Sequence, residues 1–227
     1  MSDLFDLSEQ YAEMLQRGIR LSGENQDFFI AGRLHHLTRA LPPACRPRRV
    51  LDFGCGTGNT TPFLTEAFPE ARVVGVDTAE NALAWGAARY GSPRVSFCRL
   101  ADLAHQEVFD LCYTNGVFHH IEPAGRRKAL RLILDALRPG GVFALFENNP
   151  WNPGARLVMS RIPFDRDAKP LSPREATRLL RDAGFARCAP VRSLFYFPKP
   201  LALLRSAEPC LAHLPLGAQY CVLAFKD

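Results

Sequence analysis

The stretch Val50-Leu-Asp-Phe-Gly54-Cys-Gly56-Thr-Gly58-Asn59 decides the fold predicted for this chain. An apolar, β-like run over residues 49–53 stops at three glycines, and a helix candidate follows over residues 59–68. Glycines let a chain turn sharply from strand to helix and let a ligand approach the backbone. The first turn of a helix offers free N–H groups and a partial positive charge. The sequence therefore predicts a strand–turn–helix unit that binds a ligand.

Strands and helices alternate beyond this unit. Further β-like runs cover residues 71–76, 94–98, 109–113 and 142–146, and helix candidates cover residues 78–90 and 124–137. Such alternation predicts βαβ units and a parallel sheet with helices on both faces. Two more β-rich segments, at 191–197 and 220–225, close the chain. We therefore expect an α/β protein with a doubly wound sheet.

The two ends of the chain add to this α/β core. Residues 1–41 are predicted to form an N-terminal cap of two amphipathic helices, with apolar residues in the second at 30, 34, 37 and 41. Residues 42–227 then form the main domain. The segment 148–171 contains four prolines and little periodicity, so we interpret it as a lid or binding loop. Residues 172–175 have the signature of a helix start, and 198–214 of a short helix.

Composition narrows the class of protein. The 227 residues are 47% hydrophobic, which fits one globular domain and excludes a disordered chain. The net charge of +5 is mild and scattered, so nucleic acid is not an expected partner. No run approaches the ~18 apolar residues of a transmembrane helix. The seven cysteines are dispersed and the N-terminus lacks a secretory pattern, so a cytoplasmic location is expected.

The spacing of the glycines and of two acids discriminates between cofactors. Asp77 lies 19 residues after Gly58, about where doubly wound folds place an acid on a ribose. Dinucleotide sites favour the spacing G-x-G-x-x-G, which would require glycine at position 59, where this chain has asparagine. Asp52 would repel a pyrophosphate and attract a ligand that carries a sulfonium and an ammonium group.

On these residues the chain, from about position 48 to its end, resembles the class I S-adenosylmethionine-dependent methyltransferases. The resemblance implies a Rossmann-like sheet of seven strands, mostly parallel with an antiparallel last strand, and S-adenosylmethionine as the cofactor. It further implies that the methionine part lies on the strand–turn–helix unit, the ribose on an acid after the second strand, the adenine after the third, and the sulfonium near the end of the fourth. The residues at these places are Asp52, Gly54, Gly56, Gly58, Asp77, Ala101, Asp102 and Asn115.

The resemblance also implies methyl transfer to a small-molecule acceptor. The apolar and aromatic segments 194–198 and 201–204 favour O- or N-methylation of an aromatic or lipid-like metabolite. Two alternatives stay open. One is an RNA or protein methyltransferase, which would need a basic or peptide-binding surface. The other is a protein that binds S-adenosylmethionine without turning it over. The sequence gives no oligomeric state.

His119 and His120 are the candidate catalytic residues. They follow the fourth predicted strand, at the sheet edge where open α/β sheets bind ligands. Because imidazole titrates near neutrality, one of them is predicted to act as a general base, held neutral by burial among apolar neighbours. The alternative is a structural role in local packing. We expect no metal site, because adjacent side chains should diverge and no carboxylate lies at a matching spacing.

Overall fold

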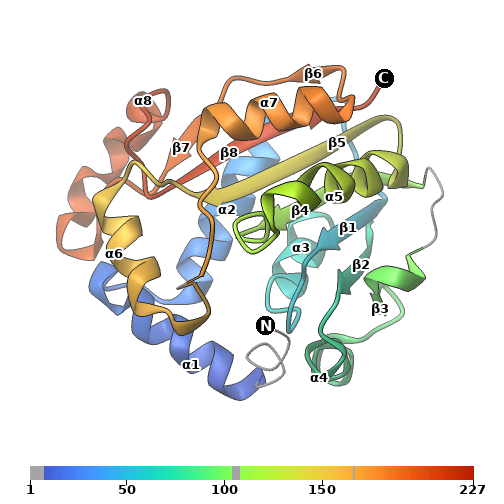
Figure 1. The fold of residues 1–227 in the computed structure, drawn as a ribbon, viewed down its shortest axis with the longest axis horizontal. Helices are drawn as coiled ribbons and strands as arrows, with labels where there is room; N and C mark the ends of the chain where they lie inside the picture. Colours follow the sequence, from blue (N-terminus) through green and yellow to red (C-terminus); the bar gives the residue numbers. More distant parts are fainter. Residues whose placement is uncertain (1–7, 104–107, 166) are drawn as a thin grey trace.

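The structure is a computed structural model that describes residues 8–103, 108–165 and 167–227, with the side chains of residues 8–13 and Phe164 outside the description (Figure 1). Its centre is one sheet in the order β3-β2-β1-β4-β5-β8-β6, with β7 also paired to β8. The strands are β1 (Arg49–Phe53), β2 (Arg72–Asp77), β3 (Val95–Arg99), β4 (Phe109–Asn115), β5 (Leu137–Asn148), β6 (Arg187–Cys188), β7 (Arg192–Leu194) and β8 (Gln219–Phe225).

Pairing within the sheet confirms the predicted topology. β1 to β5 pair in parallel, and β8 runs antiparallel to β5. The sheet has eight strands where seven were expected, because two short strands, β6 and β7, pair with β8 in place of the one predicted over residues 191–197. Pro190 lies between them, and proline has no N–H to donate to a ladder.

Helices cover both faces of the sheet. The α-helices are α1 (Ser8–Ile19), α2 (Gln26–Ala40), α3 (Thr61–Ala67), α4 (Glu80–Tyr90), α5 (Pro123–Ala136), α6 (Pro153–Arg161), α7 (Pro173–Ala183) and α8 (Glu208–Leu211). Shorter 3-10 turns are η1 (Arg20–Ser22), η2 (Leu100–Asp102), η3 (Pro163–Asp165) and η4 (Lys199–Ala207). No helix within these described ranges has the length and apolarity needed to cross a bilayer.

Two apolar clusters hold the layers together. In one, Leu130 of α5 and Leu180 of α7 pack with β4 and β5. In the other, Leu34 and Leu37 of α2 pack with Leu64 of α3 and the opposite side chains of the same strands. The second predicted N-terminal helix therefore shares the core of the sheet. The boundary at residue 41 stays a prediction.

The segment 148–171, which we interpreted as a lid or binding loop, is partly helical. It contains α6, whose first turn is capped by the Asn152 side chain accepting a hydrogen bond from the Ala155 N–H at 2.8 Å. Asn152-Pro153 repeats the signal of Ser172-Pro173 before α7, so the start of α6 was visible in the sequence. Gly18 of α1 lies against Ile162, just after α6. The two helices thus lie side by side beyond the carboxyl ends of the strands (Figure 1).

Candidate functional site

A cavity of about 410 Å³ lies at the carboxyl ends of β1, β4 and β5. The glycine loop after β1 forms one wall, and α1, α2, α6 and the segment around Phe195 form the others. Six of the predicted site residues line it, namely Asp52, Gly54, Gly56, Asn115, His119 and His120. The other four, Gly58, Asp77, Ala101 and Asp102, are not among its lining residues.

The first two glycines of the loop have different structural roles. Gly54 has φ +72°, and a Cβ there would come within 2.4 Å of the Val117 side chain. Gly56 has φ +53°, and a Cβ there would meet nothing within 4 Å. Gly54 therefore allows close packing against the loop after β4, whereas Gly56 presents bare backbone to the cavity. Both conformations disfavour residues with a side chain.

Asp52, in β1, is a buried carboxylate without a complete set of partners. Its side chain is 3% exposed, and its Oδ2 has no hydrogen-bond partner among the described residues. Burial, followed by the negative charge of Asp77, raises the pKa of this carboxyl to about 7, although the Arg33 guanidinium opposes the rise. A cationic ligand in the cavity would stabilise the ionised form. The residue thus fits the ammonium and sulfonium charges of S-adenosylmethionine.

Asp77, at the end of β2, holds the glycine loop. Its Oδ2 accepts a hydrogen bond from the Gly56 N–H at 2.7 Å, and its Oδ1 accepts from the N–H groups of Thr78 and Ala79. The carboxylate therefore ties β2 to the turn that borders the cavity. Its contact with a ribose stays a prediction.

The predicted adenine pair lies apart from the cavity. Asp102 in η2 accepts a hydrogen bond from Arg99 Nε at 2.7 Å, and half of its side chain is exposed. Ala101 beside it is exposed as well. Asn115, by contrast, ends β4 at the cavity, and its buried Oδ1 has no partner among the described residues. That oxygen is available to a ligand, so Asn115 fits a place beside the cofactor.

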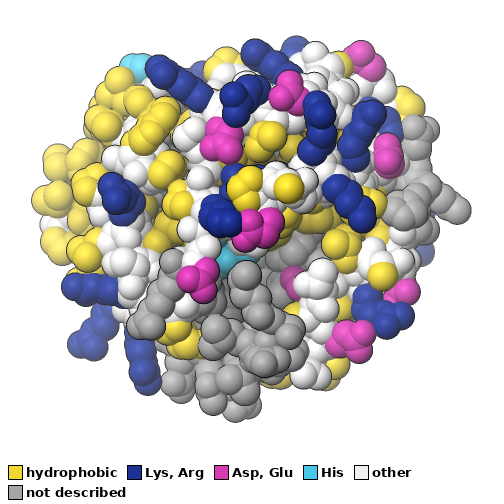
Figure 2. Space-filling model, viewed as in Figure 1, with side chains coloured by type: hydrophobic (Ala, Val, Ile, Leu, Met, Phe, Trp, Pro, Cys, Tyr) yellow, Lys and Arg dark blue, Asp and Glu magenta, His cyan; other side chains and the backbone are white. Residues whose placement is uncertain are grey.

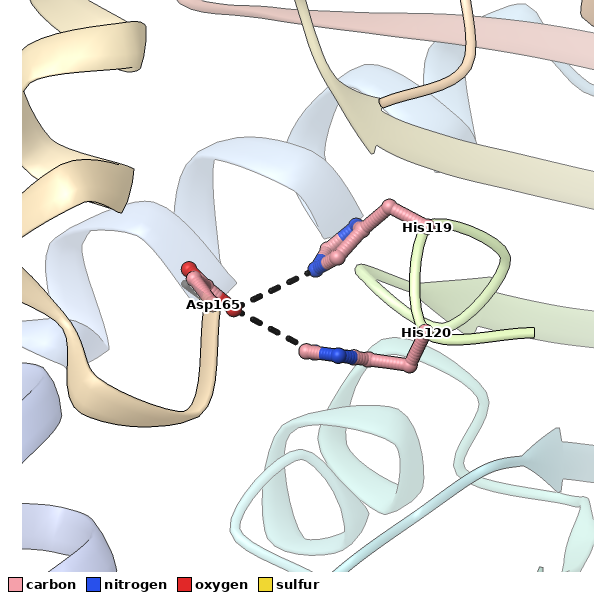
Figure 3. A group of neighbouring side chains, drawn as sticks. All are labelled: His119, His120 and Asp165. Atoms are coloured by element: carbon pink, nitrogen blue, oxygen red, sulfur yellow. Dashed lines mark ion pairs between the residues drawn. The ribbon is translucent and has the colours of Figure 1, made fainter. Parts of the chain in front are cut away.

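His119 and His120 converge, which corrects the expectation that their side chains diverge. They follow β4 in a tight turn, and their ring centroids are 4.1 Å apart. Both point at Asp165 of η3, which lies 45 residues later in the chain (Figure 3). The Asp165 Oδ1 lies 3.4 Å from His119 Nε2 and 3.3 Å from His120 Nε2. A carboxylate therefore does meet both imidazoles, through tertiary structure.

His119 is also bonded to a second carboxylate, Glu147 in β5. Its Nδ1 lies 2.6 Å from Glu147 Oε2, and both side chains are almost fully buried. Burial alone would lower the pKa of His119, but the charge of Glu147 and the contacts with Asp165 outweigh burial and raise that pKa to about 10. The expectation that burial keeps the imidazole neutral is therefore wrong for His119. The neighbouring imidazoles likewise hold the pKa of Asp165 below its ordinary value, against its burial.

Arg33 and Tyr113 line the cavity but were not predicted from the sequence. Arg33 Nε donates to the Tyr113 hydroxyl at 2.9 Å, and its Nη1 donates to Gln219 Oε1 at 3.0 Å. The guanidinium is thus fixed near Asp52 by neutral partners. One signal was present in the sequence. Arg33 occupies a position on the apolar face of the second predicted helix, where a charged residue is unusual.

Comparison with known proteins agrees with this geometry. Residues 50–141 match the family described as a methyltransferase domain. Trans-aconitate 2-methyltransferase of Rhodopseudomonas palustris strain BisB18 is 32% identical over 122 residues, which are 54% of this chain and 47% of that protein. The enzyme of the same name from an Azoarcus species is 39% identical over 113 residues, covering 48% of this chain and 43% of that protein. The chain spans about half the length of these curated relatives.

Solved structures extend the likeness across the whole fold. A S-adenosylmethionine-dependent methyltransferase of Thermotoga maritima superposes with a TM-score of 0.68 at 19% identity, covering 96% of this chain and 97% of that one. One from Mesorhizobium loti has a TM-score of 0.61 at 24% identity, covering 86% and 98%. A doubly wound sheet with a glycine turn and an acid at the carboxyl edge defines the class I methyltransferase fold. The family match, the curated relatives and the shared fold together support a class I S-adenosylmethionine-dependent methyltransferase.

Proposed function

We propose that this protein binds S-adenosylmethionine and transfers its methyl group to a small-molecule acceptor held in the cavity. The observation that carries the proposal is the buried Asp52 carboxylate, whose Oδ2 has no partner among the described residues, in the cavity that the open backbone of Gly56 also lines. A ligand with an ammonium and a sulfonium group would add to the positive charge of Arg33 and favour the ionised carboxylate. The free state of all seven cysteines supports a reducing, cytoplasmic location.

Each cofactor residue would have a separate task. Asp52 would hold the positively charged methionine part against Gly54, Gly56 and Gly58, and Asn115 would border the sulfonium. Asp77 would accept hydrogen bonds from the ribose hydroxyls, and Ala101 with Asp102 would meet the adenine amino group. The cofactor, when bound, supplies an activated methyl group for in-line displacement. The walls of the cavity contribute alignment, which accounts for much of the rate in reactions of this kind.

The acceptor end of the cavity has an aromatic wall. Phe195 lies 5.9 Å from Phe28 and 5.0 Å from Phe29 between ring centroids, and all three line the cavity. This wall supports O- or N-methylation of an aromatic or lipid-like metabolite. A second acceptor class, a small carboxylate of the kind that the relatives are named for, is favoured by Arg205. Its Nη1 forms an ion pair with Glu24 Oε1 at 2.9 Å, while its Nη2 is buried in the cavity wall without a partner among the described residues.

The candidate catalytic residues, His119 and His120, face the same cavity. We assign the proton transfer to His120, because it is the more exposed of the two and its ring is oriented by Asp165. His119, held between two carboxylates, would fix the geometry of the pair. A base is needed only for an acceptor that loses a proton as it attacks.

Turnover with a panel of acceptors tests the proposal. The purified protein is incubated with S-adenosylmethionine and aromatic, lipid-like or carboxylate acceptors, and release of S-adenosylhomocysteine is measured. His120→Ala should lower turnover roughly 10²–10⁴-fold with little change in cofactor affinity. His213→Ala, an exposed histidine outside this cavity, is the control.

The same assay separates the alternatives. Cofactor binding without release on any acceptor would support a non-catalytic binding protein. Methylation of RNA or of a peptide, with retention on heparin that is lost at moderate salt, would support a macromolecular substrate. On the face drawn in Figure 2, Lys and Arg side chains are spread out with Asp and Glu between them, which favours the small molecule.

A further inference from the structure

We propose that His119, His120 and Asp165 form a binding site for a divalent transition-metal ion in the wall of the cavity. The three side chains come from two separate segments and point at a common centre (Figure 3). One ligand atom from each of the three residues lies within 4.8 Å of the others. Metal binding is tested separately from methyl transfer, although an ion on His120 Nε2 would occupy the lone pair assigned above to proton transfer.

The distances fit metal ligands better than hydrogen-bonded partners. Charge-assisted hydrogen bonds between nitrogen and a carboxylate measure about 2.7–2.9 Å. The two Nε2···Oδ1 distances are 3.4 and 3.3 Å, and the buried Oδ1 lacks a well-aligned donor among the described residues. Ligand atoms about 2.1 Å from one ion, at angles of about 90–109°, lie roughly 3.0–3.4 Å apart. The Asp165 oxygen is therefore placed as a neighbouring ligand of both imidazoles.

Glu147 supplies the support that metal-binding histidines usually have. Its Oε2 lies 2.6 Å from His119 Nδ1, and its Oε1 accepts a hydrogen bond from the Phe118 N–H at 2.7 Å. A carboxylate on Nδ1 fixes the imidazole with its Nε2 lone pair directed at the ion. This arrangement leaves Nε2 of His119 aimed at the common centre.

Charge and donor type select the ion. Two buried carboxylates, Glu147 and Asp165, face two imidazoles, and an ion of charge +2 balances them when both imidazoles are neutral ligands. Two nitrogens and one carboxylate oxygen suit Zn²⁺, Fe²⁺, Co²⁺ or Ni²⁺ better than Mg²⁺ or Ca²⁺, which prefer oxygen. Three protein ligands leave a position open, and here it would face the cavity. A hydroxyl or carboxylate oxygen of the acceptor fits that position.

Titration of the metal-free protein with Co²⁺ tests the site. Calorimetry and visible absorption should give one saturable site per chain in the parent protein. We expect Co²⁺ to bind at least tenfold more weakly to His120→Ala and to the isosteric Asp165→Asn. We expect Glu147→Gln to weaken Co²⁺ binding roughly 10–100-fold. His35→Ala is the matched control, since His35 is the exposed member of the other adjacent histidine pair. Circular dichroism and thermal unfolding confirm that each variant is folded.

Three results would overturn the proposal. These are the absence of a saturable site, equal Co²⁺ affinity in the parent and in Asp165→Asn, and a thiolate charge-transfer band that persists in His120→Ala. The last would place the ion on a cysteine. S-Adenosylhomocysteine affinity is measured on the same samples. It reports on the proposed cofactor binding separately, because the cofactor residues are not changed.

Discussion

At the scale of single residues, the site depends on side chains whose burial leaves a polar atom without a partner. Within the part of the chain that the structure describes, Asp52 and Asn115 each have such an oxygen at the cavity. A buried polar atom without a partner costs about 1–3 kcal/mol, so these positions lower the stability of the free protein. A ligand that satisfies them recovers that loss on binding. The feature of Asp52 that favours ligand binding therefore lowers the stability of the free protein.

The titration of Asp52 should make this cost in stability measurable. Its pKa is raised from 3.8 to about 7 in the folded chain, so the folded state holds the proton more tightly than the unfolded state. The stability that this proton contributes is therefore lost as the pH rises from about 4 to about 7. Asp52→Asn should stabilise the free protein at pH 8, on the order of a few kcal/mol, in denaturant unfolding.

The same shift predicts how cofactor affinity depends on pH. A cationic ligand prefers the ionised carboxylate, so calorimetry should find S-adenosylmethionine bound roughly tenfold more weakly at pH 6 than at pH 8. Asp52→Asn should bind weakly at both pH values. Asp182→Asn, an exposed acid on α7, should behave like the parent protein. Affinity in the parent that does not change between pH 6 and pH 8 would contradict the assignment.

At the scale of elements, the turn between β1 and α3 separates packing from binding. Gly54 and Gly56 both have positive φ, and a left-handed conformation costs a residue with a side chain roughly 1–2 kcal/mol. Of these two, Gly54 is the enclosed one, with Val117 at 2.4 Å from a Cβ built on it. Substitution of Gly54 by alanine should therefore mainly lower stability, whereas substitution of Gly56 should mainly weaken ligand binding.

Gly54→Ala should lower the free energy of unfolding by clearly more than the strain alone, because the new methyl group collides with Val117. Gly56→Ala should lower the free energy of unfolding by about 1–2 kcal/mol and remain folded. Its methyl group enters the cavity and should weaken the binding of S-adenosylhomocysteine at least tenfold. Urea unfolding and calorimetry measure the two effects. Equal losses of stability, with cofactor affinity retained in Gly56→Ala, would contradict the separation.

At the scale of the whole molecule, the cavity joins the N-terminal helices, the glycine loop, α6 and the segment before η4. A ligand there contacts parts of the chain that are distant in sequence and therefore stabilises the fold as a unit. At a ligand concentration 100 times the dissociation constant, binding adds about 2.7 kcal/mol to the free energy of unfolding. For a chain of this size that is a rise in Tm of roughly 5–10 °C.

S-Adenosylhomocysteine should produce this rise, and NADH should not. Differential scanning fluorimetry at matched ligand concentrations makes the comparison, with Asp52→Asn as the variant in which the rise is reduced. A rise with NADH alone would overturn the choice of cofactor.

The sequence by itself determined the alternation of strands and helices, the glycine turn and the class of protein. These features follow from local patterns, since the period of apolar residues and the positions of glycine are properties of short segments. It also placed Asp52, Asn115, His119 and His120 at one edge, because parallel strands end together.

Only the tertiary structure decided what these residues meet. Asp165 and Glu147 reach the histidines from 45 and 28 positions away, and Arg33 reaches Tyr113 across 80. The protonation of His119 depends on those distant carboxylates, so local burial alone gave the wrong sign for its pKa shift. Packing of α6 and η3 against the sheet edge brings these groups together, and no short segment encodes that approach.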